Sequence, residues 1–316
     1  MNILIIGASG RIGFFIAKYF NNLSEINCYA VVRNFPAYCL NKQNNIKVFL
    51  HDFSSTKNIS DEICNIDYDI VINCAYDIKS PSEILRNNYL ILENISKLNV
   101  KTLINLSSIS VYGKSLFDLK NNNRVLPDTF YSKLKFKLEK FAVKICKQKK
   151  INLINLRLGN VYGEGQLWSD IIDDLIESNN KIKLYENGNY FSNCINIKTI
   201  CNALESFIKL SHNYNGTNYF NFVDQHNNKW SQILALHKKN KDFLIINLDK
   251  HDHNSFKKDF NKKYNLINKI IKKLRVFISI LTKDEVIKDK LFNLFSKFSY
   301  PVDKKIMLSK RINKIK

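Results

Sequence analysis

The first half of the chain alternates short apolar runs with longer amphipathic segments. The apolar runs show no alternation of polar and apolar residues, so each is expected to be a strand buried on both faces. The runs are Ile3–Ile6, Tyr29–Val32, Ile46–Leu50, Ile70–Asn73, Leu103–Leu106 and Leu153–Leu156. Helical segments separate most of them. This succession predicts a doubly wound α/β fold, a parallel sheet between helices that binds ligands at the carboxyl ends of its strands.

The regular alternation lapses after Gly163. The expected elements are a helix over Ser169–Ser178, an extended segment over Lys181–Tyr185, a helix over Ile197–Leu210 and a strand over Tyr219–Val223. No repeat and no Pro/Gly/Ser linker divides the chain. We therefore expect a first domain at residues 1–164 with a return segment at 195–223. A smaller C-terminal cap is expected from residues 165–194 and 224–316.

A glycine-rich turn follows the first predicted strand. Gly7, Gly10 and Gly13 have the spacing G-x-x-G-x-x-G, directly before a helix expected over Phe14–Phe20. In a dinucleotide-binding turn, glycine permits the tight bend, lets the backbone approach a pyrophosphate and allows close helix–strand packing. The pattern predicts an NAD(P)-binding Rossmann domain. The expected cofactor contacts in this turn are Gly7, Ser9, Gly10, Arg11, Ile12 and Gly13.

The end of the second strand is where such a fold meets the adenosine ribose, and here it reads Val31-Val32-Arg33-Asn34. It has no Asp or Glu to accept from a ribose 2′-hydroxyl, whereas Arg33 could pair with a 2′-phosphate. NADP is therefore expected in preference to NAD. The same sequence would also fit Arg33 as a solvated loop residue with no ligand.

A tyrosine and a lysine open a helix predicted to run through Cys146. In Tyr131-Ser132-Lys133-Leu134-Lys135, the i, i+4 spacing places the Tyr131 hydroxyl and the Lys135 ammonium on one helical face. The lysine charge favours the phenolate there, so the pKa of Tyr131, ordinarily about 10, is expected to be lowered. A tyrosine of that kind serves as an acid and base near neutrality. The motif alone is weak in a lysine-rich chain.

The order of the motifs is more specific than any one of them. The strand Leu103–Leu106 runs into Ser107-Ser108-Ile109-Ser110-Val111-Tyr112-Gly113, about twenty residues before Tyr131. The whole arrangement resembles the extended short-chain dehydrogenase/reductases, specifically the NAD-dependent sugar epimerase/dehydratase family. The resemblance runs from Met1 to about Val223. It implies an enzyme with a Rossmann domain and a substrate-binding cap.

The resemblance implies a role at each matching position. Ser108 is similar to the serine that hydrogen-bonds the reacting hydroxyl or carbonyl, and Tyr131 to the proton donor and acceptor. Lys135 is similar to the residue that holds the nicotinamide ribose and lowers the pKa of the tyrosine. The other implied cofactor contacts are Asp52 and Phe53 beside adenine, Cys74, Ala75 and Tyr76 at a strand end, Asn88 on a helix, and Leu158. Asn160 is an implied substrate contact, together with Ser108.

Departures from the family pattern narrow the chemistry. The 4,6-dehydratases carry an Asp-Glu pair where this chain has Ile109 and Ser110, so neither dehydration nor the related decarboxylation is expected. The 3,5-epimerases use a cysteine at the place of Ser110 and a histidine that Gly163-Glu164-Gly165 does not offer. Ser192–Thr199 also lacks the arginine, histidine and aspartates of the family's R-D-Y-I-H-V-D-D segment, which removes usual contacts to a nucleotide diphosphate.

Simple hydride chemistry on an activated sugar, nucleotide- or lipid-linked, is what remains. A 4-ketoreductase would consume NADPH at each turnover, whereas a 4-epimerase would keep its cofactor and return the hydride to the opposite face. Either would suit surface polysaccharide biosynthesis, and Arg33 favours the reductase. The alternative is a non-catalytic NADP-binding sensor or scaffold, against which the joint presence of Ser108, Tyr131 and Lys135 argues. The resemblance implies a homodimer.

Charge and cysteine usage exclude other classes. The net charge is +21, but residues 255–316 alone hold 18 Lys/Arg against 5 Asp/Glu. With no helix-turn-helix, RNP or finger pattern, a nucleic-acid partner is not expected. The seven cysteines are scattered singly, so neither a disulfide framework nor a metal site is expected. No long apolar run and no signal peptide are found, which predicts a cytoplasmic protein.

The basic C-terminal segment contains one further pattern. Between Leu266 and Leu281, apolar residues recur at three- and four-residue intervals opposite lysines, as in an amphipathic helix. Two interpretations fit: a cap helix with solvated lysines, or a peripheral contact with the anionic inner face of a membrane.

Overall fold

The computed structural model describes most of the chain up to residue 247. The described residues are 1–34, 37–38, 41, 44, 46–55, 58–77, 83–118, 124–178, 181–224, 228–237 and 243–247. The amphipathic helix predicted at 266–281 lies outside them. The chain divides into two compact units, Met1–Gln166 with Asn193–Asn227, and Leu167–Ser192 with Asn228–Lys316.

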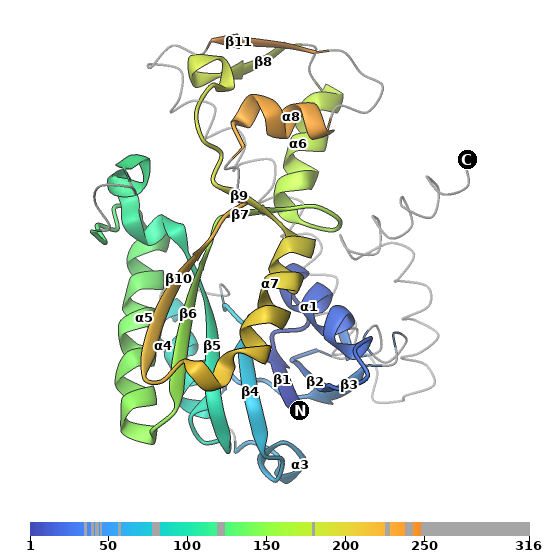
Figure 1. The fold of residues 1–316 in the computed structure, drawn as a ribbon, viewed down its shortest axis with the longest axis vertical. Helices are drawn as coiled ribbons and strands as arrows, with labels where there is room; N and C mark the ends of the chain where they lie inside the picture. The colour runs from blue at the N-terminus through green and yellow to red at the C-terminus, as the bar shows by residue number, and fades with distance from the viewer. Residues whose placement is uncertain are drawn as a thin grey trace. The chain divides into compact units, whose positions relative to one another are not determined.

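The first unit is built on a seven-stranded sheet in the order β10-β6-β5-β4-β1-β2-β3 (Figure 1). Every neighbouring pair in this sheet is parallel. The strands are β1 Asn2–Ile6, β2 Asn27–Val32, β3 Lys47–Leu50, β4 Tyr68–Asn73, β5 Val100–Ser108, β6 Asn152–Leu158 and β10 Thr217–Phe222. The predicted doubly wound Rossmann class is therefore confirmed.

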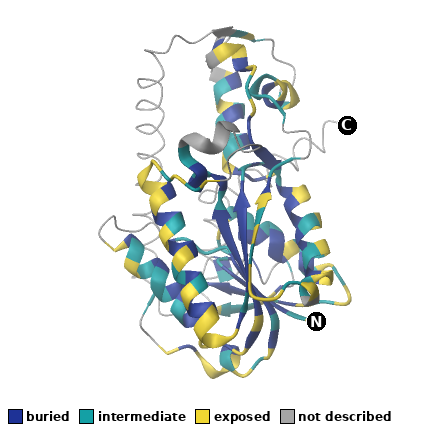
Figure 2. Cartoon of the chain, turned by 60° about the vertical axis from the view of Figure 1, so that its left-hand side comes forward, coloured by how far each residue is buried: buried dark blue, intermediate teal, exposed yellow. Residues whose placement is uncertain are grey.

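Helices cover both faces of this sheet. They are α1 Arg11–Asn21, α3 Asp61–Cys64, α4 Ile84–Ile95, α5 Phe130–Lys149 and α7 Ile197–Lys209, with 3₁₀ segments η1 Ile109–Asp118 and η3 Ser211–Asn213. One core cluster joins α1 and α7 to the sheet, and a second joins α4 and α5 to it. In Figure 2 the strands are largely buried, whereas the helices carry a buried and an exposed side. This is the burial that unbroken apolar strands require.

Local sequence signals fix the start of α5. Thr129 and Ser132 form a reciprocal capping box, in which each side chain accepts from the backbone N–H of the other residue. The box begins the helix next to Tyr131, so it determines where the first turn presents the tyrosine. The helix ends at Lys150, which adopts a left-handed conformation with φ 57°.

A short two-stranded sheet completes the first unit. Strand β7 (Asn160–Tyr162) pairs in parallel with β9 (Cys194–Asn196). Asn196 then caps α7, because its side chain accepts from the backbone N–H of Lys198. The segment Ser192–Thr199, which lacks the family's charged residues, therefore contains strand β9 and the start of α7.

The described residues of the second unit form two helices, a 3₁₀ segment and a strand pair. Its elements are α6 Leu167–Ser178, β8 Lys181–Leu184, η2 Tyr185–Gly188, α8 Trp230–His237 and β11 Leu244–Asn247. Strand β11 pairs in parallel with β8. Trp168 and Trp230 pack with ring centres 5.4 Å apart, and His237 Nδ1 lies 2.9 Å from Asp173 Oδ1, so the two helices are joined by apolar and polar contacts.

No helix in the described part of the chain is both long and apolar enough to cross a bilayer.

Candidate active site

The glycine turn is closely packed between β1 and α1. Gly7 has φ +86°, and a Cβ on it would lie 2.7 Å from the backbone of Ala75 at the end of β4. A Cβ on Gly13 would collide with the carbonyl oxygen of Gly7. Both positions therefore require glycine. The first turn of α1 contains no acidic residue, so its N–H groups and the positive end of its dipole suit an anion.

Other predicted residues of this turn lie beside it. Arg11 donates from Nη1 to the carbonyl oxygen of Gly165, 3.2 Å away. Ile12 packs against the core that α1 shares with the sheet. The backbone N–H of Ala75 donates to the side-chain oxygen of Asn73, 3.2 Å away. The turn and the end of β4 thus meet at the carboxyl edge of the sheet.

Arg33 stands at the carboxyl end of β2, as predicted, and it is paired. Its Nη1 lies 2.7 Å from Oδ1 of Asp77, whose side chain is completely buried. Asn87 donates to the other carboxylate oxygen of Asp77 at 2.8 Å. Asn88 accepts from the backbone N–H of Asp77 and donates to its carbonyl oxygen. Asn88, an expected cofactor contact, therefore holds the loop after β4.

Asp52 and Phe53 follow β3. The Asp52 carboxylate accepts from the backbone N–H of Ser54 at 2.9 Å and so shapes the turn after the strand. Phe53 is buried in the core beneath α4, where Asn94 donates to its carbonyl oxygen. Asp52 is therefore the more accessible member of the predicted adenine-side pair.

Ser108, Tyr131 and Lys135 come together from β5 and α5. Ser108 is the last residue of β5, and its hydroxyl is hydrogen-bonded to Tyr131 and accepts from the backbone N–H of Ser110 at 3.2 Å. The Lys135 amine lies 6.0 Å from the centre of the Tyr131 ring and 4.3 Å from that of Tyr76. Tyr76 meets Tyr131 edge-on at 5.7 Å. The i, i+4 spacing thus produces the predicted shared face.

The electrostatics of this trio differ from the sequence expectation. Burial raises the pKa of Tyr131, and the hydrogen bond with Ser108 lowers it in part. Burial lowers the pKa of Lys135 to about 8, against the attraction of Glu139. The expected lowering of the Tyr131 pKa by Lys135 is therefore wrong for this arrangement, because desolvation outweighs the lysine charge. Although 43% of Tyr131 is exposed, its hydroxyl is hydrogen-bonded to Ser108.

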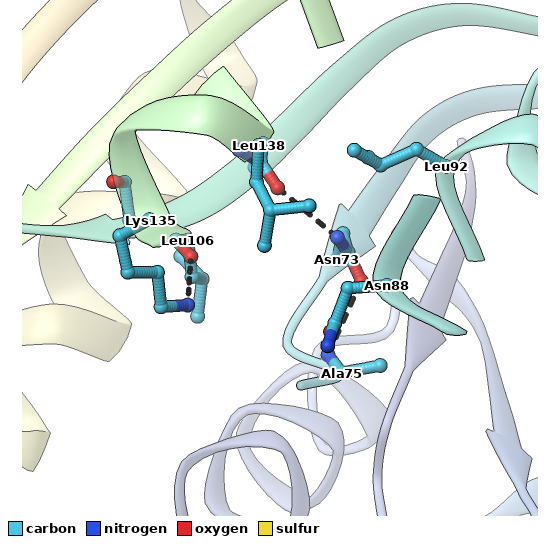
Figure 3. Close-up of a pocket in the computed structure, with 9 residues that line it drawn as sticks. Asn73, Ala75, Asn88, Leu92, Leu106, Lys135 and Leu138 are labelled. Carbon is cyan, nitrogen blue, oxygen red and sulfur yellow. Dashed lines mark hydrogen bonds between the residues drawn. The ribbon is translucent and has the colours of Figure 1, made fainter. Parts of the chain in front are cut away.

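An asparagine ladder crosses the sheet below the lysine. Asn73, Asn105 and Asn155 occupy the same register on β4, β5 and β6. Asn73 donates to Asn105 at 3.0 Å, and Asn105 donates to Asn155 at 2.8 Å. With Lys135 and Asn88, the first two line a small cavity of about 10 Å³ (Figure 3). That is close to the space one water molecule needs.

Lys135 is anchored at the edge of this cavity. Its amine donates to the carbonyl oxygen of Leu106 at 3.2 Å (Figure 3). Only 9% of the residue is exposed. The backbone bond and the neighbouring Tyr76 ring therefore hold the amine in one position beneath Tyr131.

A buried ion pair supports α5 from behind. Arg157 on β6 makes two hydrogen bonds to the Glu139 carboxylate, at 3.1 and 2.8 Å. Glu139 also accepts from the Ser107 hydroxyl at 2.6 Å, and Arg157 donates to the Tyr112 hydroxyl at 2.8 Å. Both charged residues are almost fully buried. The network therefore links α5 to β5 and β6.

The remaining predicted residues lie along the same edge. Leu158 is the buried last residue of β6, and Asn160 begins β7, where its backbone N–H donates to the carbonyl oxygen of Asn193. Cys74 follows β4, and burial raises the pKa of its thiol. Ser9 lies within the glycine turn. Among the described residues, no group of three His, Cys, Asp or Glu side chains could hold a metal ion.

The comparison with protein-family models decides the family. The model described as the NAD dependent epimerase/dehydratase family matches residues 3–208. The chain belongs to this family. A search of curated proteins found no match.

Solved structures show the same fold as this epimerase/dehydratase-family chain. UDP-N-acetylglucosamine 4-epimerase from Bacillus cereus has a TM-score of 0.62 at 16% identity, over 79% of this chain and 87% of that one. dTDP-glucose 4,6-dehydratase from Bacillus anthracis, in complex with NAD, has a TM-score of 0.61 at 17% identity, over 79% and 85%. A mutant UDP-glucuronic acid 4-epimerase from Bacillus cereus, in complex with NAD and a fluorinated UDP-sugar, has a TM-score of 0.64 at 17% identity, over 79% and 86%.

Sequence reasoning missed three features of this family member's site. Asp77 carries no local signal, because its partner Arg33 follows a different strand and is 44 residues away in the sequence. Glu139 could have been found, since it extends the i, i+4 series of Tyr131 and Lys135 by one turn. The asparagine ladder left a weaker signal, one asparagine within or at the end of each of three apolar strands.

Proposed function

We propose that this protein is an NAD-dependent 4-epimerase of a nucleotide sugar. The observation that carries the proposal is the joint placement of Ser108, Tyr131 and Lys135 at the carboxyl edge of the sheet, beside the glycine turn. Ile109 and Ser110 stand where an acid and a base would be needed for dehydration. The site therefore suits oxidation and re-reduction of one hydroxyl.

The chain's own residues fit a dinucleotide cofactor. The turn has no room for a side chain at Gly7 or Gly13, and the N-terminus of α1 offers N–H groups to a pyrophosphate. When bound, the nicotinamide would accept and return a hydride. Lys135, fixed by Leu106, would hold the ribose, and Ala75 and Tyr76 would border it at the end of β4.

The protein's own side chains would carry out the proton transfer. Tyr131 would take the proton of the sugar 4-hydroxyl as the hydride leaves and give it back when the hydride returns on the opposite face. Ser108 would hydrogen-bond the same oxygen, and Asn160 would contact the sugar. Taking the proton requires the phenolate form of Tyr131, which burial disfavours, and giving it back to the 4-keto group requires the phenol, which the raised pKa favours.

The cofactor separates the two hydride reactions. Arg33 suggested NADP and thereby a 4-ketoreductase, but its guanidinium is already paired with Asp77. This pairing favours NAD, and with it the epimerase. A role in surface polysaccharide biosynthesis, a homodimer and a peripheral membrane contact remain predictions.

The test is incubation of the purified protein with NAD and, in turn, UDP-glucose, UDP-N-acetylglucosamine and UDP-glucuronic acid, followed by NMR of the sugar. The proposal expects a C4 epimer with no net NADH. Stoichiometric oxidation of NADPH by a 4-keto sugar, without epimer, would establish the ketoreductase instead. NAD binding without turnover on any sugar would support the non-catalytic alternative.

A further inference from the structure

The arginine at the expected ribose site of the cofactor is paired with a buried carboxylate. Arg33 directly follows β2, where a Rossmann fold meets the adenosine ribose. Its side chain is 35% exposed, whereas the side chain of Asp77, 2.7 Å away, has no exposure. Arg33 is therefore accessible to a ligand, and the charge that offsets it lies behind it.

Asp77 is held in this position from α4. Asn87 donates to Oδ2 of Asp77 at 2.8 Å, which leaves Oδ1 for Arg33. Asn88 makes two hydrogen bonds to the backbone of Asp77 and a third, at 2.6 Å, to the carbonyl oxygen of Ile84 within its own helix. The carboxylate is thus fixed by side chains from a packed helix, and it stays in place whether or not a ligand contacts Arg33.

A fixed carboxylate changes what Arg33 can bind. The Asp77 carboxylate accepts from Nη1 of Arg33 and neutralises the single positive charge of its guanidinium. A 2′-phosphate brought to Arg33 would approach this negative charge and be repelled by it, in a site where burial strengthens the interaction. A ribose 2′-hydroxyl is neutral and would suffer no such penalty, and the remaining guanidinium N–H groups could donate to it.

We propose that Asp77 is a specificity-determining residue that makes the protein prefer NAD over NADP by neutralising Arg33. The proposal rests on the proposed function only in requiring a dinucleotide at the glycine turn. It says nothing of which sugar reacts. The same arginine without its carboxylate would act as the phosphate partner that the sequence suggested.

The test is the ratio of NAD and NADP dissociation constants, measured by calorimetry without any sugar, for the wild type and Asp77→Asn. The asparagine keeps the shape and accepts from Arg33, but it has no charge. The expected result is NAD preference in the wild type and a shift of the ratio towards NADP by about tenfold or more in the variant, the effect of one unit charge a few ångströms away. Asn87→Ala, which removes a partner of Asp77 without changing charge, should keep the ratio.

Several outcomes would overturn the proposal. NADP preference in the wild type, or an unchanged ratio in Asp77→Asn, removes Asp77 as the determinant. If NADP binding falls with Asp77→Asn, the carboxylate orients Arg33 for phosphate instead. If Asp77→Asn does not fold by circular dichroism, Asp77→Ser gives the same comparison. Binding of neither dinucleotide by the wild type overturns the cofactor assignment as well, whereas normal NAD binding without epimerisation defeats only the proposed reaction.

Discussion

In the proposed catalytic trio of Ser108, Tyr131 and Lys135, burial and hydrogen bonding shift the pKa of Tyr131 in opposite directions. Desolvation raises the pKa of Tyr131 and lowers that of Lys135 to about 8, so at neutrality the tyrosine is the protonated phenol and the lysine is still mostly the charged ammonium. Ser108 counters part of the desolvation of Tyr131. Proton transfer therefore depends on a local hydrogen bond as much as on the nearby amine.

Tyr131→Phe removes the hydroxyl and leaves the ring contact with Tyr76. We expect kcat to fall by about 10²–10⁴-fold, the usual worth of general acid–base catalysis, with the NAD dissociation constant nearly unchanged. Tyr19→Phe is the matched control, because its hydroxyl bonds Glu205 at the surface of α1 and α7. Steady-state kinetics and calorimetry give both quantities. A Tyr131→Phe variant with more than half the wild-type kcat would remove the tyrosine from the mechanism.

Lys135 should make stability depend on pH. Its pKa is about 8 in the folded protein and 10.5 in an unfolded chain, so between these values the unfolded state binds the extra proton. The linkage relation then makes the free energy of unfolding rise with pH over about 8 to 10.5. The penalty for a buried charge is greatest below pH 8.

Urea unfolding of Lys135→Met and the wild type at several pH values checks this. The free energy of unfolding of the variant, relative to that of the wild type, should be highest at pH 7. The difference between the two should shrink towards pH 10.5. Lys133→Met, which alters an exposed lysine on the same helix, should show no such trend. A gap that is constant with pH would mean that Lys135 keeps an ordinary affinity for its proton.

At the scale of elements, α5 and β6 are joined through charge. Glu139 and Arg157 are both buried and bonded twice to each other, and Ser107 and Tyr112 satisfy further polar groups. Removing one partner of such a pair leaves an unpaired charge in the core. Removing one of the two side chains should therefore cost more free energy of unfolding than replacing both with apolar residues.

Glu139→Leu should destabilise the protein by about 3–5 kcal/mol, while Glu139→Leu combined with Arg157→Met should recover much of the loss. Urea denaturation of the two variants and the wild type measures both values. Additive losses in the double variant would show that the two side chains act independently, against the network described.

The turn between β1 and α1 gives a second prediction for an element. Gly13→Ala places a methyl group against the Gly7 carbonyl, so the helix must move away from the strand. We expect a loss of about 1–3 kcal/mol in stability, as for overpacking, and a large loss of NAD affinity. Gly10→Ala is the milder comparison for stability alone, because its new Cβ would lie 3.2 Å from the Gly7 carbonyl oxygen, a contact that a small shift can relieve. Equal NAD affinity in Gly13→Ala and the wild type would contradict the packing argument.

The elements were predictable where the pattern is local. Unbroken apolar strands, the glycine spacing and the Tyr131–Lys135 interval each depend on residues close in sequence. The Arg33–Asp77 pair, the Glu139–Arg157 bond and the asparagine ladder join segments 18 to 50 residues apart, so no local pattern predicts them. The sign of the Tyr131 pKa shift was missed for the same reason, because it depends on desolvation by the surrounding fold.

For the molecule as a whole, the first unit contains every residue assigned to the proposed chemistry. The glycine turn, the ends of β4 and β5, and the first turn of α5 all come from Met1–Gln166, and the family match at residues 3–208 covers them. The second unit contains α6, α8 and their polar contact through His237.

We propose above all that Tyr131 takes up and returns the proton of the sugar 4-hydroxyl while a hydride passes reversibly from C4 to bound NAD. Rapid mixing of the NAD-loaded protein with a UDP-hexose substrate, followed by NADH absorbance in a single turnover, tests this directly. The account predicts a transient rise and decay of NADH in the wild type, and a rise slowed by about 10²–10⁴-fold in Tyr131→Phe. Epimer formed with no NADH transient, or an identical transient in the variant, would contradict it.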